Sequence, residues 1–326
     1  MLTKEEWMEE VKAILANEYH HRHPFQIQLQ EGKLNKAQIQ AWALNRYFYQ
    51  SHIPVKDAII ISRLSDPQLR VQWRKRLEHH DGTDNSVGGV QNWLNLTRAL
   101  GFPDEYVTSG IGVLPATRFS VQAYVQFCKE KSVLEAVASS LTEIGARSLI
   151  ETRTAGMLEH YDFIDKKSLQ YFFERLKQND GKSTGVMEYL VKTVKTPQQV
   201  TQVLDSVVFK CQVLWAQSDA LYSAYVNPGI LPYGAYDPIV QLGSAYKLAD
   251  GIVLEKDACR IQGPEKAFSL NPTAFQFINS LSHRKPLECL IAESIAEHPQ
   301  QSSQVQQDLM KLCRDLLEKG IIAPCN

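Results

Sequence analysis

The sequence predicts an all-α helical bundle over its first two-thirds, followed by a small α+β, winged-helix-like domain. Three observations support this division. Apolar residues recur every three or four positions from Thr3 to about Val226, prolines and glycines concentrate between 228 and 243, and short strand-like segments then precede three helices. A chain of 326 residues suits two domains of unequal size better than one hydrophobic core.

Helix starts can be located in the first part of the chain. Thr3 and Glu6 form a capping-box pattern, and Asn35 and the pair Asp66-Pro67 are typical of helix N-termini. The rows that follow each place their members on one helix face: Trp7, Val11, Ile14 and Leu15; Ile39, Trp42, Arg46, Tyr49 and Ile53; and Leu69, Trp73, Arg76, Leu77 and His80. We expect no strand before Val226.

The second part of the chain differs in its pattern. We expect a helical domain at 1–226, a linker at 227–245 and a second domain at 246–326, because the helix breakers lie at Pro228, Gly229, Pro232, Gly234, Pro238 and Gly243. The stretch ADGIVLEKDACRIQGPEKAFSLN is typical of short strands and turns. Three helices should then begin at Asn271-Pro272, Pro286 and Ser303, the last of them ending at Gly320.

Composition limits the partners and the compartment. A formal net charge of −1 argues against a nucleic acid or a membrane surface held by bulk electrostatics. The start MLTKEEWMEEVK is too charged for a secretory signal, and no stretch approaches the ~18 apolar residues of a membrane span. We therefore expect a cytoplasmic protein. The six cysteines are scattered without a C-x-x-C pair, which favours reduced thiols in the core over disulfides or zinc ligands.

Cations interrupt several of the apolar rows. Arg46 and Gln50 share one face, Arg76 and His80 another, and further cases are Arg153, Lys210 and the pair Tyr171 and Arg175. Each cation alone is best explained by snorkelling or by pairing with a carboxylate such as Asp57, Glu143 or Glu151. Together they predict one positive pocket, walled by Tyr19, Tyr124 and Tyr171, that suits a planar polyanion.

Histidines cluster in YHHRHP at 19–24 and in EHHDG at 78–82. A di-iron bundle would repeat a Glu-x-x-His spacing, which this sequence lacks, so we expect no metal. His20 and His80 suit either general acid/base catalysis or a structural place at a helix end.

Ordered motifs identify a family. The segments EYHHRHPFQ, ALNRYFYQSHIPVKDA, EHHDG, ASSLTE, LQYFFERL and VFKCQVLW resemble the pyrroloquinoline-quinone (PQQ) synthase family from about Trp7 to Val226. The segment 246–326 resembles the small peptide chaperone of the same pathway, in the arrangement of a natural fusion. The resemblance implies a seven-helix, haem-oxygenase-like bundle without haem, usually a homodimer.

The resemblance also implies a reaction and partners. Such enzymes use no cofactor and take O2 as co-substrate. They close a ring in a tricarboxylate precursor and oxidise it by eight electrons, releasing PQQ and H2O2. The C-terminal domain would bind the precursor peptide and present it to a radical SAM enzyme. An electron-rich substrate can reduce O2 directly where the site stabilises the negative charge that develops on oxygen.

Matching motifs carry roles onto this chain. The implied catalytic residues, which move protons and face oxygen, are His80, Tyr171, Arg175, Lys210 and His20. A protonated histidine is expected to supply positive potential beside Arg175 and Tyr171. The implied substrate-binding residues are Tyr19, Arg46, Gln50, Lys56, Arg76, Tyr124, Thr142 and Arg153.

Some positions depart from the family pattern. Ile150 stands where many relatives have a second pocket histidine, the stretch IGARS brings Gly145 and Arg147, and the loop TDNSVGG is less acidic than expected. Two other hypotheses remain open. One is a metal-dependent oxygenase or a thiamin-degrading hydrolase of the same fold, although Cys128 and Cys211 have the pattern of core residues rather than nucleophiles. The other is a non-catalytic protein that binds quinone or peptide.

Overall fold

The computed structural model divides the chain into two compact units, residues 1–236 and 237–326. It describes residues 3–144, 146–177, 182–227, 229, 231–232, 235–237, 240, 244–255, 259–262 and 267–325. Most of the helix breakers of the predicted linker, and Gly145, therefore lie outside the described residues. Each unit is considered by itself.

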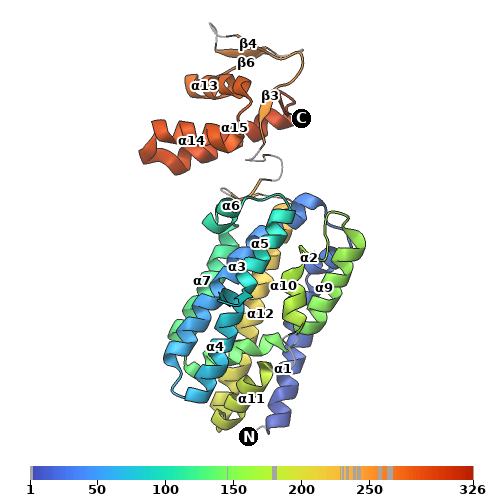
Figure 1. Ribbon diagram of the computed structural model, residues 1–326, viewed down its shortest axis with the longest axis vertical. Coiled ribbons are helices and arrows are strands. Elements are labelled where there is room, and N and C mark those ends of the chain that lie inside the picture. Colours follow the sequence, from blue (N-terminus) through green and yellow to red (C-terminus); the bar gives the residue numbers. More distant parts are fainter. Residues whose placement is uncertain are drawn as a thin grey trace. The chain divides into compact units, whose positions relative to one another are not determined.

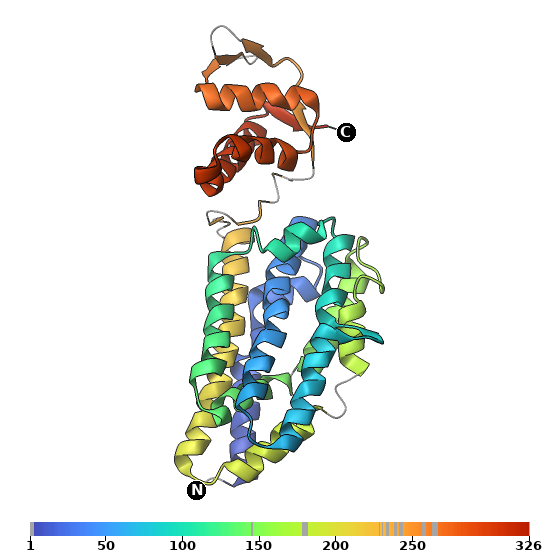
Figure 2. The same ribbon diagram turned by 60° about the vertical axis from the view of Figure 1, so that its left-hand side comes forward.

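The first unit is a bundle of helices, as predicted (Figure 1). Its long helices are α1 (Lys4–Glu18), α3 (Lys36–Arg63), α4 (Pro67–Asp81), α7 (Pro115–Glu130), α9 (Ala146–His160) and α12 (Pro197–Tyr225). Shorter helices complete it: α2 (Pro24–Gln30), α5 (Gly89–Ala99), α6 (Asp104–Ser109), α8 (Val133–Ala138), α10 (Gln170–Lys177) and α11 (Lys182–Thr193), with 3-10 turns η1 (His20–Arg22) and η2 (Ser139–Glu143). In Figure 2, α12 runs the length of the unit beside α7.

The predicted helix starts are confirmed. Thr3 and Glu6 form a reciprocal capping box at α1, and Asn35 forms one with Gln38 at α3. Asp66 accepts hydrogen bonds from the first backbone N–H groups of α4, and Pro67 occupies the first turn, where its missing N–H costs nothing.

A short hairpin breaks the expected all-helical pattern. Strands β1 (Gly82–Thr83) and β2 (Ser86–Val87) pair between α4 and α5. Gly82 has φ +91°, and a Cβ on Gly88 would lie 2.4 Å from the backbone of Asp81, so both positions require glycine. Two-residue strands give no alternating pattern, which explains why periodicity missed them. The hairpin begins directly after α4 ends at Asp81, one residue past His80.

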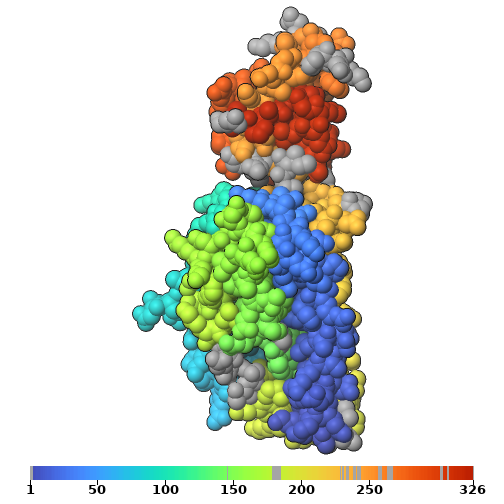
Figure 3. Space-filling model, turned by 90° about the vertical axis from the view of Figure 1, so that its right-hand side faces the viewer, coloured from blue at the N-terminus to red at the C-terminus, as the bar shows by residue number. Residues whose placement is uncertain are grey.

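Two hydrophobic cores fill the first unit. One surrounds Trp42, Trp93 and Phe172, and the indole N–H of Trp93 donates to the Ala43 carbonyl at 2.9 Å. The other surrounds Trp7, Trp73 and the inner face of α12. Burial of aromatic and branched side chains on this scale is the main stabilising term of such a bundle. Figure 3 shows α1 next to the segment of α9 and α10 on one face of the unit.

The first unit extends beyond the predicted boundary at Val226. The backbone N–H of Tyr236 donates to the Gly112 carbonyl at 2.8 Å, and its side chain is buried in the first core. The Tyr236 hydroxyl also donates to the Gln40 side chain at 3.1 Å. Tyr236, which the sequence assigns to the linker, thus packs as part of the first unit.

The second unit has the predicted order of strands and helices. Strands β4 (Val253–Glu255), β5 (Arg260–Gln262) and β6 (Ala267–Ser269) form an antiparallel sheet. Helices α13 (Pro272–Ser280), α14 (Leu287–Glu297) and α15 (Ser302–Glu318) follow, with 3-10 turns η3 (Leu281–His283) and η4 (Pro299–Gln301). Strand β3 (Tyr246–Leu248) pairs with β7 (Ile322–Pro324), a long-range contact that local patterns do not reveal.

Two further properties of the described residues concern the chain as a whole. All six cysteines are free; Cys128, Cys211 and Cys313 are buried, but Cys289 is exposed, so the expectation of core thiols is wrong there. No helix in the described ranges has the length and apolar character needed to cross a membrane.

Candidate active site

A pocket lies between the two cores of the first unit. Residues of the first core, among them Ile150, Tyr171 and Phe172, form one side, and residues of the second core, among them Tyr19 and Tyr124, form the other. Twelve of the thirteen predicted site residues line it: Tyr19, His20, Arg46, Gln50, Lys56, His80, Tyr124, Thr142, Arg153, Tyr171, Arg175 and Lys210. The predicted convergence is thus observed, whereas the individual roles stay predictions.

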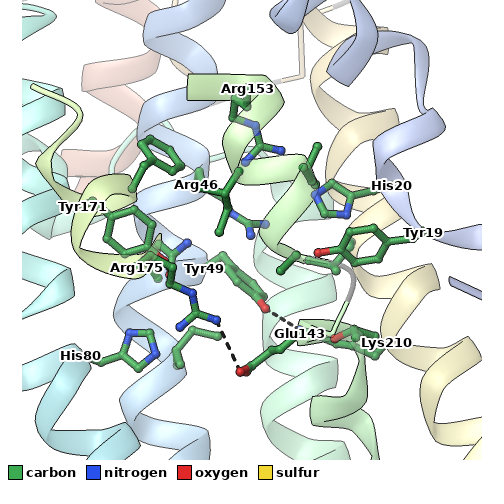
Figure 4. A pocket seen from close by; sticks show the side chains of 18 of the residues that line it. Tyr19, His20, Arg46, Tyr49, His80, Glu143, Arg153, Tyr171, Arg175 and Lys210 are labelled. Atoms are coloured by element: carbon green, nitrogen blue, oxygen red, sulfur yellow. Dashed lines mark hydrogen bonds and ion pairs between the residues drawn. The ribbon is translucent and has the colours of Figure 1, made fainter. Parts of the chain in front are cut away.

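Helix geometry brings these side chains together from most of the bundle. Helix α3 contributes Arg46, Gln50, Ile53 and Lys56, which follow one another at steps of four, three and three residues along the side of the helix that borders the pocket. Figure 4 shows His80, Tyr171 and Arg175 on one side of the cavity and Tyr19 and His20 on the opposite side. The pocket therefore has two distinguishable ends.

The charges that line the pocket are mostly positive. Five cations face it (Arg46, Lys56, Arg153, Arg175 and Lys210), against one carboxylate among the described lining residues, Glu143. Lys56 is paired behind the lining with fully buried Asp57 at 2.6 Å. In the described part of the chain, no carboxylate lies within 4.0 Å of the Arg46 or Arg153 guanidinium. This excess of positive charge requires an anion.

The structure places Arg76 apart from the other predicted site residues. It is not among the residues that line the pocket. Both of its terminal nitrogens donate to the Glu143 carboxylate, one of them at 3.0 Å, and its Nε lies 3.9 Å from Asp57. Glu143 also lies 3.5 Å from Arg175. Burial raises the pKa of Glu143, but Arg76 and Arg175 outweigh this and hold that pKa well below its usual value. Arg76 thus holds an ionised Glu143 beside the pocket, and its own contact with the substrate stays a prediction.

Both pocket histidines are buried, and their pKa values are lowered. His20 is 2% exposed and His80 is 4% exposed. Burial lowers both pKa values well below the usual one; Arg46 and Arg153 add to the effect at His20, and Arg175 adds to it at His80. These shifts favour the neutral imidazole, and the protonated histidine expected beside Arg175 stays a prediction. A neutral imidazole can act as a proton acceptor.

Hydroxyl groups complete the polar lining. Tyr171 donates to the Gln50 side-chain oxygen at 3.0 Å, and Tyr49 accepts a hydrogen bond from Lys210 at 2.6 Å. Burial raises the pKa of Tyr19 to about 12 and also raises that of Tyr49, so both stay protonated. Burial, with repulsion from Lys56 and Arg46, lowers the pKa of Lys210 well below its usual value.

Sequence reasoning missed part of the lining. Tyr49 stood on the row of Arg46, so helical spacing could have assigned it to the site. Glu143 was considered only as a possible counter-charge. The apolar residues of the lining cannot be distinguished from core residues in the sequence. They are Ile53, Ala146, Leu149, Ile150, Phe172 and Leu214. Ile150 faces the cavity, so its departure from the family pattern lies in the site itself.

Among the residues that the structure describes, no group of three or more His, Cys, Asp or Glu side chains has an arrangement that could hold a metal ion.

Comparison with known proteins places this site in context. The sequence profile of the TENA/THI-4/PQQC family matches residues 9–220. A pyrroloquinoline-quinone synthase from Gluconobacter oxydans is 50% identical over 238 residues, 73% of this chain and 99% of that protein. A bifunctional coenzyme PQQ synthesis protein C/D from Methylorubrum extorquens is 45% identical over 279 residues, 84% of this chain and 72% of that protein. Because 84% of the chain exceeds the 236 residues of the first unit, this similarity extends into the second.

A solved structure supports the fold. A domain of unknown function from Shewanella denitrificans, described as having a haem oxygenase-like fold, matches with a TM-score of 0.59 at 17% identity, over 73% of this chain and 99% of that chain. At that identity the likeness concerns the fold alone, and it confirms the haem-oxygenase-like fold expected from the sequence.

Proposed function

The chain belongs to the TENA/THI-4/PQQC family, and from this premise we propose that it is a pyrroloquinoline-quinone synthase of PQQ biosynthesis. Its substrate is a tricarboxylate precursor, which it closes into a ring and oxidises by eight electrons with O2, without a cofactor. Each O2 that becomes H2O2 takes two electrons and two protons from the substrate. The observation that carries the proposal is the convergence of five cations on a pocket with one lining carboxylate among the described residues.

The two ends of the pocket have different tasks. Arg46 and Arg153, which have no carboxylate partner in the described chain, hold carboxylates of the substrate and orient it. Tyr171, Arg175 and His80 form the other end, where oxygen accepts electrons. Neutral His20 and His80 accept protons from the substrate, and removal of these protons makes it electron-rich enough to reduce O2.

The second unit has its own role in the proposal. It binds the precursor peptide and presents it to a radical SAM enzyme, in line with the similarity to a C/D protein. Binding of a fluorescently labelled precursor peptide to the full chain, measured by anisotropy, tests this; no change in anisotropy would contradict it. We also propose a homodimer, which the molar mass from light scattering tests.

One experiment tests the reaction. The full chain, freed of metal with a chelator, is mixed with the tricarboxylate precursor in air, and oxygen uptake and quinone absorbance are followed together. We expect both signals without added metal and neither under anaerobic conditions. Activity that depends on added iron would favour the metal-dependent oxygenase instead. Tight binding without turnover would favour a binding protein.

Replacing Arg46 with methionine should weaken binding of PQQ by roughly 10- to 100-fold, because one charge-assisted bond to a carboxylate is lost. The Arg46 guanidinium lies 4.2 Å from the centre of the Tyr49 ring, and no described carboxylate would be left unpaired by its removal. Affinity is measured by calorimetry. Arg147→Met, at an exposed arginine of α9 that pairs with Glu151 at 3.0 Å, is the matched control and should bind normally. Equal loss in both variants would contradict the role of Arg46.

Ligand binding should also take up protons. Burial and cations depress the pKa values of His20 and His80, and a bound polyanion offsets those cations, so it raises both pKa values. Bound protein therefore holds more protons than free protein, and affinity should fall as pH rises through the range in which these groups lose protons in the complex. Calorimetry in two buffers of different ionisation enthalpy measures the number taken up. Proton release on binding would contradict the prediction.

A further inference from the structure

A second, smaller chamber adjoins the pocket. Its volume is ≈ 10 Å³, room for about one water-sized group. Four residues line both spaces: His20, Arg46, Arg153 and Leu214. The chamber therefore lies directly behind the end of the pocket at which Figure 4 shows Arg46 and Arg153.

Helix α12 presents one row of side chains to both spaces. Lys210 and Leu214 line the pocket, and Gln217 and Leu221 line the chamber. These positions are four, seven and eleven residues apart, so they share one helix face. Gln217 thus continues the ligand-facing row past the residues that the family resemblance identifies.

The residues that line the chamber include buried polar atoms without hydrogen-bond partners. Arg153 Nε and Gln217 Nε2 have no hydrogen-bond partner among the described residues, and neither does His20 Nδ1. All three side chains are at least nine-tenths buried, with 4%, 5% and 2% exposure for Arg153, Gln217 and His20. Buried polar groups are normally satisfied, so the set calls for an acceptor atom between them.

The other polar side chains of the chamber are already engaged. Gln26 accepts a hydrogen bond from Arg153 Nη2 at 2.8 Å and donates to Ser218 at 3.2 Å. Asn45 donates to the Ala41 carbonyl and accepts from the Leu114 N–H, each at 2.9 Å. Gln26 and Asn45 line the chamber with their hydrogen bonds already made. The N–H groups that can still donate to a ligand there belong to Arg153 and Gln217.

Close packing holds these residues in place. A Cβ on Gly156 would lie 2.1 Å from the Gln30 carbonyl oxygen, so α9 and α2 approach each other where only glycine fits. Gly156 is one turn from Arg153, and Gln30 is one turn from Gln26, so this contact sets the distance of the Arg153–Gln26 bond. The guanidinium is thereby fixed beside the chamber.

We infer that this chamber is a subsite for one carboxylate oxygen of the ligand, held between Arg46, Arg153 and the amide N–H of Gln217. A carboxylate oxygen fits a space of one water-sized group, and it supplies the negative charge that the two arginines lack. Arg153 keeps its charge at neutral pH, although burial and Arg46 lower its pKa to about 10. Gln217 is then a specificity-determining residue. The inference rests on the proposed function in one respect, that the ligand is a polycarboxylate.

The test is Gln217→Leu, a substitution of similar size. We expect PQQ affinity to fall roughly 10- to 100-fold, the effect of losing a hydrogen bond to a charged group. The melting temperature of the free protein should stay unchanged or rise, because the substitution removes an unsatisfied buried donor. Gln26→Leu is the matched control in the same chamber. It strips Arg153 and Ser218 of their partner and should lower the melting temperature.

Three PQQ monoesters, each masking one carboxylate, locate the contact. For the ester that masks the carboxylate bound in the chamber, the wild-type protein and Gln217→Leu should have about the same affinity. For the other two esters, the wild-type protein should still bind more tightly than the variant. Equal affinity of both proteins for PQQ would overturn the inference and leave the chamber to a water molecule. A lower melting temperature with the same ratio of wild-type to variant affinity for all three esters would make Gln217 merely structural. Failure of the wild-type protein to bind PQQ would instead count against the proposed function.

Discussion

Arg175→Ala should lower kcat by roughly 10²- to 10³-fold, the usual cost of removing one donor that stabilises developing negative charge. Its affinity for the precursor should change far less. Arg175 lies at the end of the pocket opposite His20, 3.5 Å from Glu143, and Glu143 is also held by Arg76, so the guanidinium is already oriented in the free protein. Charge that appears on oxygen during electron transfer then meets a fixed cation. Single-turnover absorbance in air, together with anaerobic titration of the precursor, separates the two effects.

Two variants on the same helix sharpen this test. Arg175→Lys keeps the charge but loses the planar fork, so it should retain more activity than the alanine variant. Lys177→Ala removes an exposed cation, which pairs with Glu174 at 2.8 Å, and should behave like the wild-type protein. If Arg175→Ala loses as much affinity as turnover, Arg175 binds the substrate instead of acting on oxygen.

Local signals in the sequence predicted much of the fold. Helix starts at Thr3, Asn35, Asp66 and Asn271 depend on side chains within three residues of the N-cap, which a sequence contains in full. The pairing of β3 with β7 and the packing of Tyr236 in the first unit depend on partners far along the chain. Periodicity carries no information about such contacts.

The candidate site shows the same limit. Helical spacing placed Arg46 and Arg76 on inner faces, and the family resemblance added Lys56; Arg46 and Lys56 line the pocket and Arg76 is buried. Spacing could not tell which cation is already paired. Asp57 forms an ion pair with Lys56, and Glu143 forms one with Arg76. Which cation is paired depends on how α3, α4 and η2 pack against each other.

The charge of the histidines could not be predicted either. A sequence gives the usual pKa of an imidazole, but burial and the distance to Arg46, Arg153 or Arg175 decide the shift. These are properties of the folded pocket. The lowered pKa values that result favour the neutral form of His20 and His80.

Asp57→Asn is expected to destabilise the first unit by about 3–5 kcal/mol, because removing one partner of a buried ion pair leaves an uncompensated charge. Asp57 is 0% exposed and Lys56 is 2% exposed, and the carboxylate also accepts the Trp73 indole N–H at 2.8 Å. The loss should appear as a lower midpoint in thermal unfolding followed by tryptophan fluorescence. Glu151→Gln, which breaks the exposed pair with Arg147, is the control and should cost at most about 1 kcal/mol.

A double variant separates stability from ligand binding in this pair. Lys56→Met together with Asp57→Asn removes both charges, so most of the lost stability should return. If Lys56 also binds a substrate carboxylate, the double variant should still bind PQQ more weakly than the wild-type protein, although its stability is restored. Restored stability with wild-type affinity would make Lys56 a purely structural partner of Asp57. A melting temperature as low as that of Asp57→Asn alone would show instead that the unpaired lysine does not dominate the effect.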